Sequence, residues 1–593
     1  MGSLAKLTHL SLGNLNLCGE IPPSFANLTN LSVLSLPINQ LTGPLPAWLG
    51  NLTNLEFLDL RFNKLNGPIP PSICNLAALQ VLSLGSNHLS GTLPSCLGNL
   101  SANLRDLDIS NNNLSGMLPD SLPQVCNLVF MQLNGNRLEG KLPRSLANCK
   151  NLWALDLANN KINDVLPFWF DSLPLLESLL LSSNNFHGEI PPSFCNLTSL
   201  KALLLDKNDL SGTLPPCLAN FSEYLVLLNI GQNNLSGMIP QSFSRDCRLK
   251  MIRLGENRLE GKLPRTLANC RELEFLDFGN NQINDVFPPW LGALPELKIL
   301  ILRSNQLHGI IKDERKTKSE FPKLQIVDLS LNNFVGELPT QYFHKWKGMK
   351  KVKTERLTRY IGARNDSVRT DSYDAYSISL TNKGIVLEYP AILDTFVVLQ
   401  LSGNNFEGPI PQMIGDLEGL RLLNLSNNNL AGSIPSSLEN LSLLESLDLS
   451  GNKLSGKIPQ ELAQLTFLAV FNVSYNNHLS GAIPQGKQFY TFSNDSYVGN
   501  PELCGIPLTR QCFSEENTSP SVPDAQEDDD GDDEYSFGWK PVAIGYACGL
   551  VFGAVIGSVL VTKKYEWFSK TFGMGQKQHQ RRRRRARHIR STR

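Results

Sequence analysis

The 593-residue sequence predicts an α/β fold: a solenoid of stacked repeats with a parallel sheet on its concave face, followed near the C-terminus by one transmembrane helix. Three observations support this prediction. A leucine pattern recurs with a nearly constant period, a set of cysteines recurs at a longer interval, and one uninterrupted apolar segment lies between acidic and basic stretches. The formal net charge is +0, so composition gives no argument for a nucleic-acid partner.

Each repeat follows the pattern LxxLxLxxNxLxGxIP, as in the segments that begin at Leu31, Leu55 and Leu444. An imperfect first copy has Leu15 where the pattern has Asn. Together with that copy, the marker Asn indicates eighteen repeats. The markers are Asn39, Asn63, Asn87, Asn112, Asn136, Asn160, Asn184, Asn208, Asn233, Asn257, Asn281, Asn305, Asn332, Asn404, Asn428, Asn452 and Asn476.

Each position of the pattern has a physical reason. Leu34 and Leu36 alternate with Val33 and Ser35, so the leucines of a short strand point inward and their neighbours point outward. The Asn after the strand can pair backbone groups of neighbouring turns, the Gly allows unusual backbone angles, and the Pro discourages a long helix. A single repeat cannot bury its leucines alone, so only a stack has a continuous core.

The 24-residue period (63 − 39 between Asn39 and Asn63) and the GxIP ending resemble the plant-specific class of leucine-rich repeats. Within that class the chain resembles the plant receptor-like proteins of the Cf and Verticillium-resistance type, which have a receptor ectodomain and membrane span but no kinase. The resemblance covers residues 1–340 and 393–484.

The cysteines show that a block of five repeats is duplicated. Four cysteines recur 121 residues later (195 − 74), and their spacings of 22 and 23 residues are close to one solenoid turn. We therefore expect four disulfide bridges between neighbouring turns, outside the cell. Buried free thiols are the alternative, and zinc is disfavoured because no CxxC pair or His cluster accompanies the cysteines. The expected pairs are Cys74 with Cys96, Cys126 with Cys149, Cys195 with Cys217, and Cys247 with Cys270.

Two segments interrupt or end the repeats. The markers Asn332 and Asn404 are 72 residues apart (404 − 332), which indicates an insert at 341–392; inserts in solenoids often bind partners, although a tolerated surface loop is the alternative. The family resemblance identifies this insert as an island. It also implies a C-terminal cap at 485–520, closed by a disulfide between Cys504 and Cys512.

Asn-x-Ser/Thr sequons are dense and favour an extracellular location, although the NLT and NLS sequences of the repeat itself produce some of them. The candidate glycosylation sites are Asn27, Asn30, Asn51, Asn99, Asn113, Asn196, Asn220, Asn234, Asn365, Asn424, Asn440, Asn472, Asn494 and Asn517.

The C-terminal region predicts a single pass through the plasma membrane. An acidic linker at 521–541 precedes 21 uncharged residues at 542–562, which are long enough to span the hydrocarbon layer. The tail at 563–593 has twelve basic residues and one acid, so the positive-inside rule places it in the cytoplasm against the lipid membrane and the N-terminus outside. One helix face with glycines at four-residue intervals predicts contact with a second membrane protein. These glycines are Gly545, Gly549, Gly553 and Gly557.

We expect no catalytic residue, no metal and no cofactor, because no phosphate loop, HExxH or GxSxG motif is present and the tail is too short for a kinase. The Asp of the LDL positions is interpreted as a repeated local contact. Ligand binding is expected where large or charged residues replace the usual small ones near the concave strands. These candidates are Arg61, Phe62, Trp153, Asp206, Lys207, Arg253, Glu256 and Arg303.

The resemblance implies a cell-surface receptor that binds an extracellular, pathogen-derived protein or peptide and signals in defence through a membrane-spanning leucine-rich-repeat receptor kinase. A developmental peptide co-receptor and a polygalacturonase-inhibitor-like binding protein are the alternatives. The sequence starts at Met1 inside a repeat, without a signal peptide or N-terminal cap. We therefore expect a truncated gene model or a shortened paralogue.

Overall fold

The computed structural model describes residues 6–97, 103–120, 124–220, 224–312, 320–350, 359–362, 376–382, 385–486 and 488–512. These residues lie within one compact unit, Met1–Phe513. The predicted acidic linker, transmembrane helix and basic tail lie outside the described residues. In the part of the chain that the structure describes, no helix combines the length and the apolar character needed to cross a membrane.

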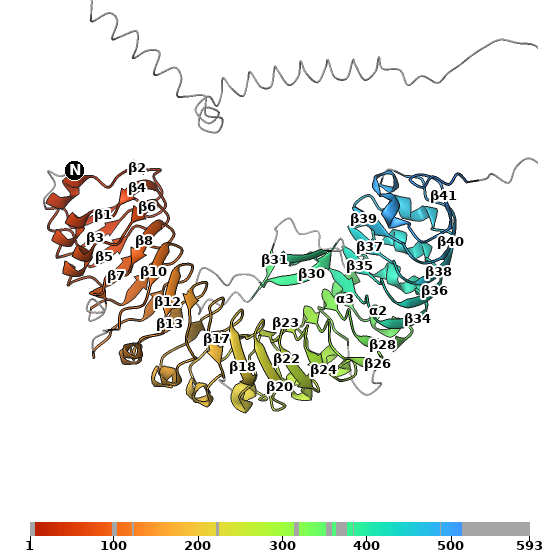
Figure 1. The fold of residues 1–593 in the computed structure, drawn as a ribbon, viewed down its shortest axis with the longest axis horizontal. Coiled ribbons are helices and arrows are strands. Elements are labelled where there is room, and N and C mark those ends of the chain that lie inside the picture. Colours follow the sequence, from red (N-terminus) through yellow and green to blue (C-terminus); the bar gives the residue numbers. More distant parts are fainter. Residues whose placement is uncertain are drawn as a thin grey trace, which may run out of the picture. The chain divides into compact units, whose positions relative to one another are not determined.

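The main sheet is parallel and pairs each strand with the strand of the next repeat. Leu10 lies opposite Leu34, which in turn lies opposite Leu58. Figure 1 shows these strands side by side along the inner side of the curved solenoid. The eighteen strands are β1 (His9–Ser11), β3 (Val33–Ser35), β5 (Phe57–Asp59), β7 (Val81–Ser83), β9 (Asp106–Asp108), β11 (Phe130–Gln132), β13 (Ala154–Asp156), β15 (Ser178–Leu180), β17 (Ala202–Leu204), β19 (Leu227–Asn229), β21 (Met251–Arg253), β23 (Phe275–Asp277), β25 (Ile299–Ile301), β27 (Ile326–Asp328), β33 (Val398–Gln400), β35 (Leu422–Asn424), β37 (Ser446–Asp448) and β39 (Val470–Asn472).

A second row of parallel strands, which we did not predict, runs through the LxG part of the repeats. Its glycines have positive φ, for example 83° at Gly43, which glycine adopts without a steric penalty. The first sheet of the row contains β2 (Cys18–Gly19), β4 (Gln40–Pro44), β6 (Lys64–Gly67), β8 (His88–Thr92), β10 (Asn113–Gly116), β12 (Arg137–Gly140) and β14 (Lys161–Ile162). The second contains β16 (His187–Gly188), β18 (Asp209–Thr213), β20 (Asn234–Met238), β22 (Arg258–Gly261) and β24 (Gln282–Ile283). The third contains β26 (His308–Ile310), β28 (Asn333–Gly336), β34 (Asn405–Pro409), β36 (Asn429–Ser433), β38 (Lys453–Gly456), β40 (His478–Ala482) and β41 (Glu502–Cys504).

The second row is interrupted at the same place in both duplicated blocks, where isolated bridges at Val165 and Val286 stand between the sheets. Asp164 explains the first interruption, because its two carboxylate oxygens accept hydrogen bonds from the N–H groups of Leu142 and Val165. Asp285 makes the equivalent two contacts in the second block. A side chain there satisfies backbone donors that strand pairing would otherwise use.

Short 3-10 helices form most of the convex side, which refines the predicted α/β class. A Pro stands at the N-cap of most of them, as Pro22 and Pro46 do, and fixes the backbone in an extended conformation. Because each repeat leaves only a few residues for the convex side, the chain forms a single short 3-10 helix there rather than an α-helix. The 3-10 helices are η1 (Pro23–Asn27), η2 (Ala47–Asn51), η3 (Pro71–Asn75), η4 (Arg144–Asn148), η5 (Phe168–Ser172), η6 (Pro192–Asn196), η7 (Pro216–Asn220), η8 (Arg265–Asn269), η9 (Pro289–Ala293), η10 (Gln412–Asp416), η11 (Ser436–Asn440), η12 (Gln460–Gln464), η13 (Phe489–Thr491) and η14 (Asn494–Ser496).

The marker Asn of each repeat holds neighbouring turns together. The Asn63 Nδ2 donates to the carbonyls of Leu36 and Leu60, at 2.9 and 3.0 Å, and its Oδ1 accepts from the Leu41 N–H at 3.0 Å. The side chain therefore satisfies backbone groups of two successive turns inside the leucine core, as the pattern predicts.

The marker Asn side chains form a ladder of hydrogen bonds along the solenoid, and Asn500 adds one further rung, which the repeat count missed. Its Nδ2 donates to the carbonyls of Val473 and Tyr497, and its Oδ1 accepts from the Asn476 N–H at 3.2 Å. The spacing of 24 residues from Asn476 (500 − 476) carried this information. Asp495 and Tyr497 stand where the pattern has its two strand leucines, and this hides the repeat in the sequence. The predicted cap therefore begins as one more solenoid turn.

The solenoid continues across the insert, because β27 pairs directly with β33. The first part of the predicted insert belongs to the solenoid: α2 (Thr340–Phe343) and α3 (Lys347–Lys350) bury Tyr342, Phe343, Trp346 and Met349 in its core. These side chains replace leucines of the convex side, so residues 340–350 pack with the solenoid core. The remaining described part of the insert lies at 359–362, 376–382 and 385–392. Its described strands form the antiparallel pairs β29 (Tyr360–Ile361) with β32 (Ile392–Leu393), and β30 (Ile378–Asn382) with β31 (Ile385–Tyr389).

Candidate functional site

The outward surface of the main sheet becomes apolar in its central strands. The third residue of the strand is apolar in β15, β17 and β25, where it is Leu180, Leu204 and Ile301, whereas Ser or Asp occupies that place in β3, β5, β7 and β9. These side chains are buried although they point away from the solenoid core, because residues of the insert pack on them. The insert contributes Ile361, Tyr376, Ile378, Leu380 and Ile392 to this second apolar cluster.

Specific contacts fix the insert on the concave face. The ring centroid of Tyr376 lies 5.2 Å from that of Phe275, and the Arg303 Nη1 donates to the Ser379 carbonyl at 2.8 Å. Gln325 donates from Nε2 to the Asp394 carbonyl at 2.9 Å. Figure 1 shows β30 and β31 inside the curve of the solenoid, over the middle of the main sheet.

A groove of about 290 Å³ lies between the insert and the neighbouring concave strands; we call it the insert groove. Its floor is apolar and its solenoid wall is polar, a combination that suits a ligand with both kinds of group. The lining residues are Ala158, Asn159, Ser182, Ser183, Leu204, Asp206, Lys207, Leu227, Asn229, Met251 and Arg253 from the solenoid, and Tyr376, Ser377 and Pro390 from the insert.

The charged residues of the insert groove are partly paired within the protein. Asp206 accepts a hydrogen bond from the Ser182 hydroxyl at 2.5 Å, and the Arg253 Nε lies 3.3 Å from the Asp277 Oδ2. Burial raises the pKa of Asp206 above its ordinary value, against the opposing effect of the Ser182 hydrogen bond. Burial likewise raises the pKa of Asp277, although the positive charge of Arg253 opposes it.

Tyr376 carries a buried hydroxyl with no hydrogen-bond partner within the described part of the chain. Its side chain is 5% exposed, and burial raises the pKa of the phenol above its ordinary value. A buried polar group without a partner costs about 1–3 kcal/mol, so an acceptor on a ligand that reached this hydroxyl would gain binding energy.

The structure brings together three of the predicted ligand-binding residues, Asp206, Lys207 and Arg253, in the insert groove. Arg303 holds the insert instead of facing open solvent. Glu256 lies in a turn after β21 and accepts hydrogen bonds from the Gln232 side-chain amide at 3.0 Å.

The other three predicted residues lie apart from the insert groove. Arg61 pairs with Asp59, with Nε 3.1 Å from Oδ1, and Phe62 is 50% exposed in the turn that follows. Trp153 lines a second, larger groove on the first block of repeats. The apolar residues under the insert were missed, although the unbroken runs LLL at Leu203 and ILIL at Ile299 indicated strands covered on both faces.

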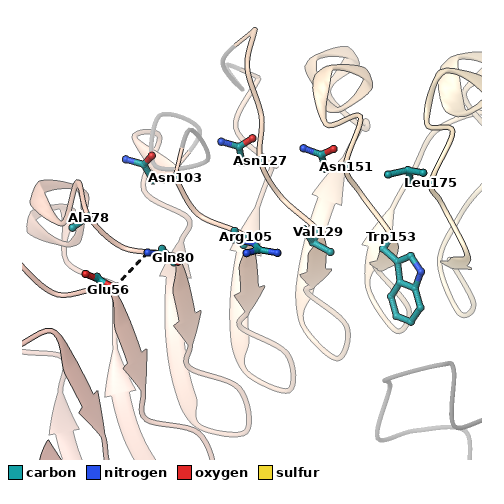
Figure 2. Close-up of a pocket in the computed structure, with 10 residues that line it drawn as sticks. All are labelled: Glu56, Ala78, Gln80, Asn103, Arg105, Asn127, Val129, Asn151, Trp153 and Leu175. Atoms are coloured by element: carbon teal, nitrogen blue, oxygen red, sulfur yellow. Dashed lines mark hydrogen bonds between the residues drawn. The ribbon is translucent and has the colours of Figure 1, made fainter. Parts of the chain in front are cut away.

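The second groove has a volume of about 770 Å³ and follows five successive repeats; we call it the edge groove. Figure 2 shows its residues in two rows, with Asn103, Asn127 and Asn151 in one row and Gln80, Arg105, Val129 and Trp153 in the other. Glu56, Ala78 and Leu175 complete the lining.

The LDL aspartates make the local contact that was expected of them. Asp156 accepts from the Ala158 N–H at 3.0 Å and Asp328 from the Ser330 N–H at 3.1 Å, each two residues along the chain. Burial raises the pKa of Asp156 to about 7. Within the described residues, no group of three or more His, Cys, Asp or Glu is placed to hold a metal ion.

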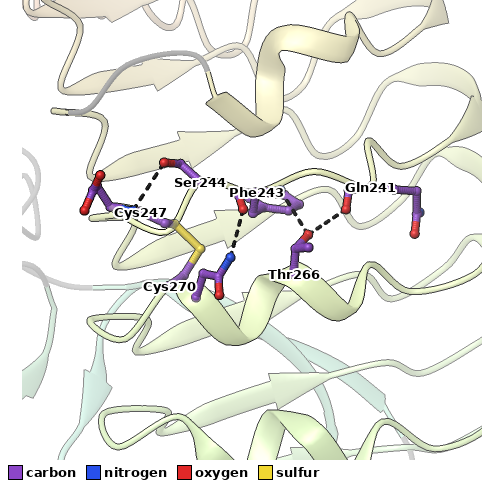
Figure 3. The surroundings of a disulfide bond; sticks show 8 residues. Gln241, Phe243, Ser244, Cys247, Thr266 and Cys270 are labelled. Carbon is purple, nitrogen blue, oxygen red and sulfur yellow. Dashed lines mark hydrogen bonds between the residues drawn. A yellow bond between two sulfur atoms is a disulfide. The ribbon is translucent and has the colours of Figure 1, made fainter.

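The structure joins the cysteines in the pairs Cys74–Cys96, Cys126–Cys149, Cys195–Cys217, Cys247–Cys270 and Cys504–Cys512. Figure 3 shows the surroundings of the Cys247–Cys270 bridge, where the Thr266 hydroxyl donates to the Gln241 carbonyl at 2.6 Å and accepts from the Phe243 N–H at 2.9 Å. The bridge and these hydrogen bonds tie the segment before Cys247 to η8 of the next turn.

The predicted glycosylation sites differ in exposure. Asn424 is 8% exposed within β35, and its Oδ1 accepts hydrogen bonds from the Ser426 N–H and hydroxyl. A glycan has no room there, so Asn424 is corrected to a structural residue. Asn472 occupies the equivalent place on β39 and is half-buried. Asn27, Asn30, Asn51, Asn113, Asn196, Asn234, Asn440 and Asn494 are exposed, whereas the side chains of Asn99, Asn220, Asn365 and Asn517 lie outside what the structure describes.

Family comparisons identify the repeats. A leucine-rich-repeat family model matches residues 102–162, 150–210 and 247–307, and a second one matches 6–28, 54–76, 78–100, 419–441 and 443–465.

Among relatives, the chain is 45% identical over 276 residues to Receptor-like protein 7 of Arabidopsis thaliana, which covers 46% of this chain and 28% of that protein. It is 48% identical over 253 residues to Receptor-like protein 9DC3 of Solanum pimpinellifolium and 47% identical over 253 residues to Receptor-like protein Cf-9 of the same species. Each of these two matches covers 42% of this chain and 28% of the relative. The matched part of the chain thus spans less than a third of the length of these relatives.

Solved structures with the same fold include plant receptor ectodomains. The ectodomain of the Arabidopsis thaliana membrane receptor kinase GASSHO1/SCHENGEN3, in complex with CASPARIAN STRIP INTEGRITY FACTOR 2, matches with a TM-score of 0.65 and 31% identity over 86% of this chain and 61% of that chain. The plant peptide hormone receptor RGFR1, in complex with RGF2, matches with a TM-score of 0.67 and 28% identity over 85% of this chain and 80% of that chain.

Proposed function

This chain belongs to the plant leucine-rich-repeat receptor-like proteins, a family of receptors rather than enzymes. We propose that it captures an extracellular ligand at the insert groove and signals in defence through a partner receptor kinase. The ligand in this proposal is a pathogen-derived protein or peptide. The protein acts at the plasma membrane, with the repeats outside the cell and the tail in the cytoplasm.

The composition of the insert groove carries the proposal. Asp206, Lys207 and Arg253 offer charges of both signs, and Leu204 and Met251 offer an apolar floor. A peptide segment presents charged, apolar and backbone amide groups within a few residues, so it can use all of these surfaces. A small apolar metabolite would leave the charges unpaired at a cost.

The bound partners of similar structures support a peptide segment as the ligand. GASSHO1/SCHENGEN3 and RGFR1 are each in complex with the factor or hormone that accompanies them. The insert groove is lined by residues of this chain's own insert and repeats, so we propose a ligand different from those of GASSHO1/SCHENGEN3 and RGFR1.

The partner kinase is proposed from the predicted membrane helix. Its glycine face leaves space for a second helix at close distance. The Arabidopsis receptor kinase HAESA is found in complex with the hormone IDA and the co-receptor SERK1, which supports a receptor that works with a second membrane protein. In the full chain, Gly549→Leu with Gly553→Leu should abolish co-purification of a receptor kinase, and unchanged co-purification would contradict this contact.

A substitution in the groove tests ligand capture. Met251→Asp puts a charge on the groove floor at the first residue of β21, whereas Val81→Asp makes the same change at the first residue of β7, where Asp106 of β9 shows that Asp is accepted. Leaf cells expressing the full chain would be exposed to extracellular fluid from infected leaves, and hydrogen peroxide release would be measured. We expect release with the unchanged chain and Val81→Asp, and at least about a tenfold loss with Met251→Asp at equal surface amounts. Equal responses of both variants would contradict capture in this groove.

Perception of a developmental peptide is the second candidate, because RGFR1 and HAESA are peptide hormone receptors in the structures of similar fold. Fluid from uninfected leaves separates the two roles. A response to that fluid of the same size as to infected fluid would favour the developmental role. Recovery of the protein from culture medium without detergent would instead favour a secreted inhibitor of polygalacturonase.

A further inference from the structure

The edge groove differs chemically between the two duplicated blocks although the backbone repeats. In the first block, three repeats place Asn103, Asn127 and Asn151 in one row of the groove. The residues 121 positions later are Tyr224, Arg248 and Glu272. Trp153 and Leu175 of the first block likewise correspond to Glu274 and Glu296. The duplication therefore provides an internal comparison in which the same surface carries mostly uncharged groups once and mostly charged groups once.

In the second block, ion pairs neutralise this surface. Lys201 lies 2.8 Å from Glu177, Lys298 lies 2.7 Å from Glu274, and Lys323 lies 2.6 Å from Glu296. Each pair joins neighbouring repeats at the positions where the edge groove runs in the first block. In these ion pairs the donors and acceptors of the side chains already bind one another, so few of them are free to bind a ligand.

In the first block, the same positions expose amides and an indole. Asn103 uses one donor within the protein, from Nδ2 to the Ala77 carbonyl at 2.7 Å, and Asn151 is exposed. Trp153 is half-buried, and its ring packs edge-on against Phe130 with centroids 5.1 Å apart and an interplanar angle of 72°. Packing on Phe130 holds the indole in place. Figure 2 shows Trp153 in the row of Gln80, Arg105 and Val129, next to the row of amides.

We propose that the edge groove of the first block binds a neutral oligosaccharide. Side-chain amides donate and accept hydrogen bonds in the same way as sugar hydroxyls, and an indole face packs against the C–H groups of a sugar ring. The volume of about 770 Å³ lies in the range of small-ligand sites, about 300–1,000 Å³. Most of the lining is uncharged, with Glu56 and Arg105 as its charged residues, so a polyanionic sugar chain gains no general attraction.

The amides recur at a regular spacing along the edge groove. Neighbouring parallel strands are about 4.8 Å apart, so one amide follows another at about that distance along the groove. This site is separate from the insert groove and does not rest on the proposed receptor function.

Titration calorimetry of the full chain with cellohexaose tests the proposal. The chain would be kept in a detergent without a sugar headgroup, because such a headgroup would compete. Trp153→Glu installs the residue that the second block carries at this position, and Asn151→Ala removes one amide with a smaller change. Glu274→Ala at the equivalent position of the second block is the matched control. Hexagalacturonic acid serves as the charged counterpart, and a ten-residue Gly-Ser peptide as the neutral peptide.

We expect cellohexaose to bind the unchanged chain and Glu274→Ala equally, with at least about tenfold weaker binding to Trp153→Glu, the size of an aromatic stacking contribution. Asn151→Ala should weaken binding about three- to tenfold, and hexagalacturonic acid should bind at least about tenfold more weakly than cellohexaose. Absence of cellohexaose binding at millimolar concentration would overturn the proposal. So would binding that Trp153→Glu and Asn151→Ala both leave unchanged, or preferential binding of the Gly-Ser peptide.

Discussion

Arg303 donates a hydrogen bond from its Nη1 to the backbone carbonyl of Ser379 at 2.8 Å, across 76 residues of sequence. The contact fixes the insert, three residues of which line the insert groove, over the concave sheet. It also changes the role of Arg303, which the sequence placed among the ligand-binding residues.

The first prediction concerns this contact. Arg303→Ser introduces the residue that stands 121 positions earlier, Ser182, and removes the hydrogen bond to the insert. A hydrogen bond to a charged group contributes about 1.5–3 kcal/mol, so the insert should open more often. Hydrogen–deuterium exchange of Ile378–Asn382 and Ile385–Tyr389 should become at least about tenfold faster. Arg61→Ser removes a cation that pairs with Asp59 and Asp108 in the first block of repeats, so it should leave exchange in the insert unchanged. Equal exchange in both variants would refute the assigned role.

The second prediction concerns the buried carboxyl group of Asp156, whose pKa is raised to about 7 by burial. In the unfolded chain the carboxyl loses its proton near its ordinary pKa of 3.8. Its stabilising effect is therefore complete below about pH 4 and is lost as the pH rises through 7. Asp156→Asn should raise the free energy of unfolding by roughly 2–4 kcal/mol more at pH 8 than at pH 4.

Asn is accepted at this position, because Asn229 makes the same contact with the Gly231 N–H. Urea unfolding at both pH values, followed by tryptophan fluorescence, measures the difference for Asp156→Asn. The reverse change, Asn424→Asp, should make unfolding easier as the pH rises. A pH-independent difference between the unchanged chain and Asp156→Asn would show that the carboxyl is already ionised in the fold.

The third prediction concerns the terminal rung of the Asn ladder. Asn500→Asp keeps an acceptor for the Asn476 N–H but loses the Nδ2 donor to Val473 and Tyr497. Unsatisfied buried carbonyls cost about 1–3 kcal/mol each, so the last turns should unfold at lower urea concentration. His478→Ala changes an exposed side chain nearby and should have no effect. Protease sensitivity between Asn476 and Cys512 reports the difference, and equal cleavage of both variants would show that Asn500 adds nothing.

The fourth prediction concerns glycan occupancy. Asn440 is exposed at the end of η11, whereas Asn424 lies buried in β35 and uses its Oδ1 within the fold. Mass spectrometry of tryptic glycopeptides from plant-expressed protein should find Asn440 occupied and Asn424 unoccupied. A glycan on Asn424 in folded protein would contradict the buried position of this side chain.

The repeat itself could be read from the sequence because its contacts are periodic. Leu34 packs on the leucines one repeat away, and Asn63 binds backbone groups of its own and the preceding turn, so a fixed spacing implies both contacts. The cysteine pairs follow from the same spacing of one turn. Asn500 escaped the count because Asp495 and Tyr497 replace the strand leucines of the pattern, although the rung itself keeps the 24-residue interval.

The candidate site was predicted only in part, because several of its contacts join distant segments. Asp206, Lys207 and Arg253 stood out from the small residues of other repeats, and they do share one groove. The role of Tyr376 could not be predicted, since nothing local to it specifies that it packs on Phe275. The apolar runs under the insert indicated coverage, but the covering segment could have come from elsewhere.

The sequence by itself determined the solenoid, its marker Asn ladder, the duplicated block and the spacing of its cysteines, since each depends on contacts between residues one period apart. The tertiary structure decided what the concave face presents. There the insert folds back over β15 to β35, and Arg303 holds it by a hydrogen bond instead of facing solvent. Asp206, Lys207 and Arg253 line the groove beside the insert. No periodic pattern encodes that return of the chain, because it depends on apolar complementarity between segments that are far apart in the sequence.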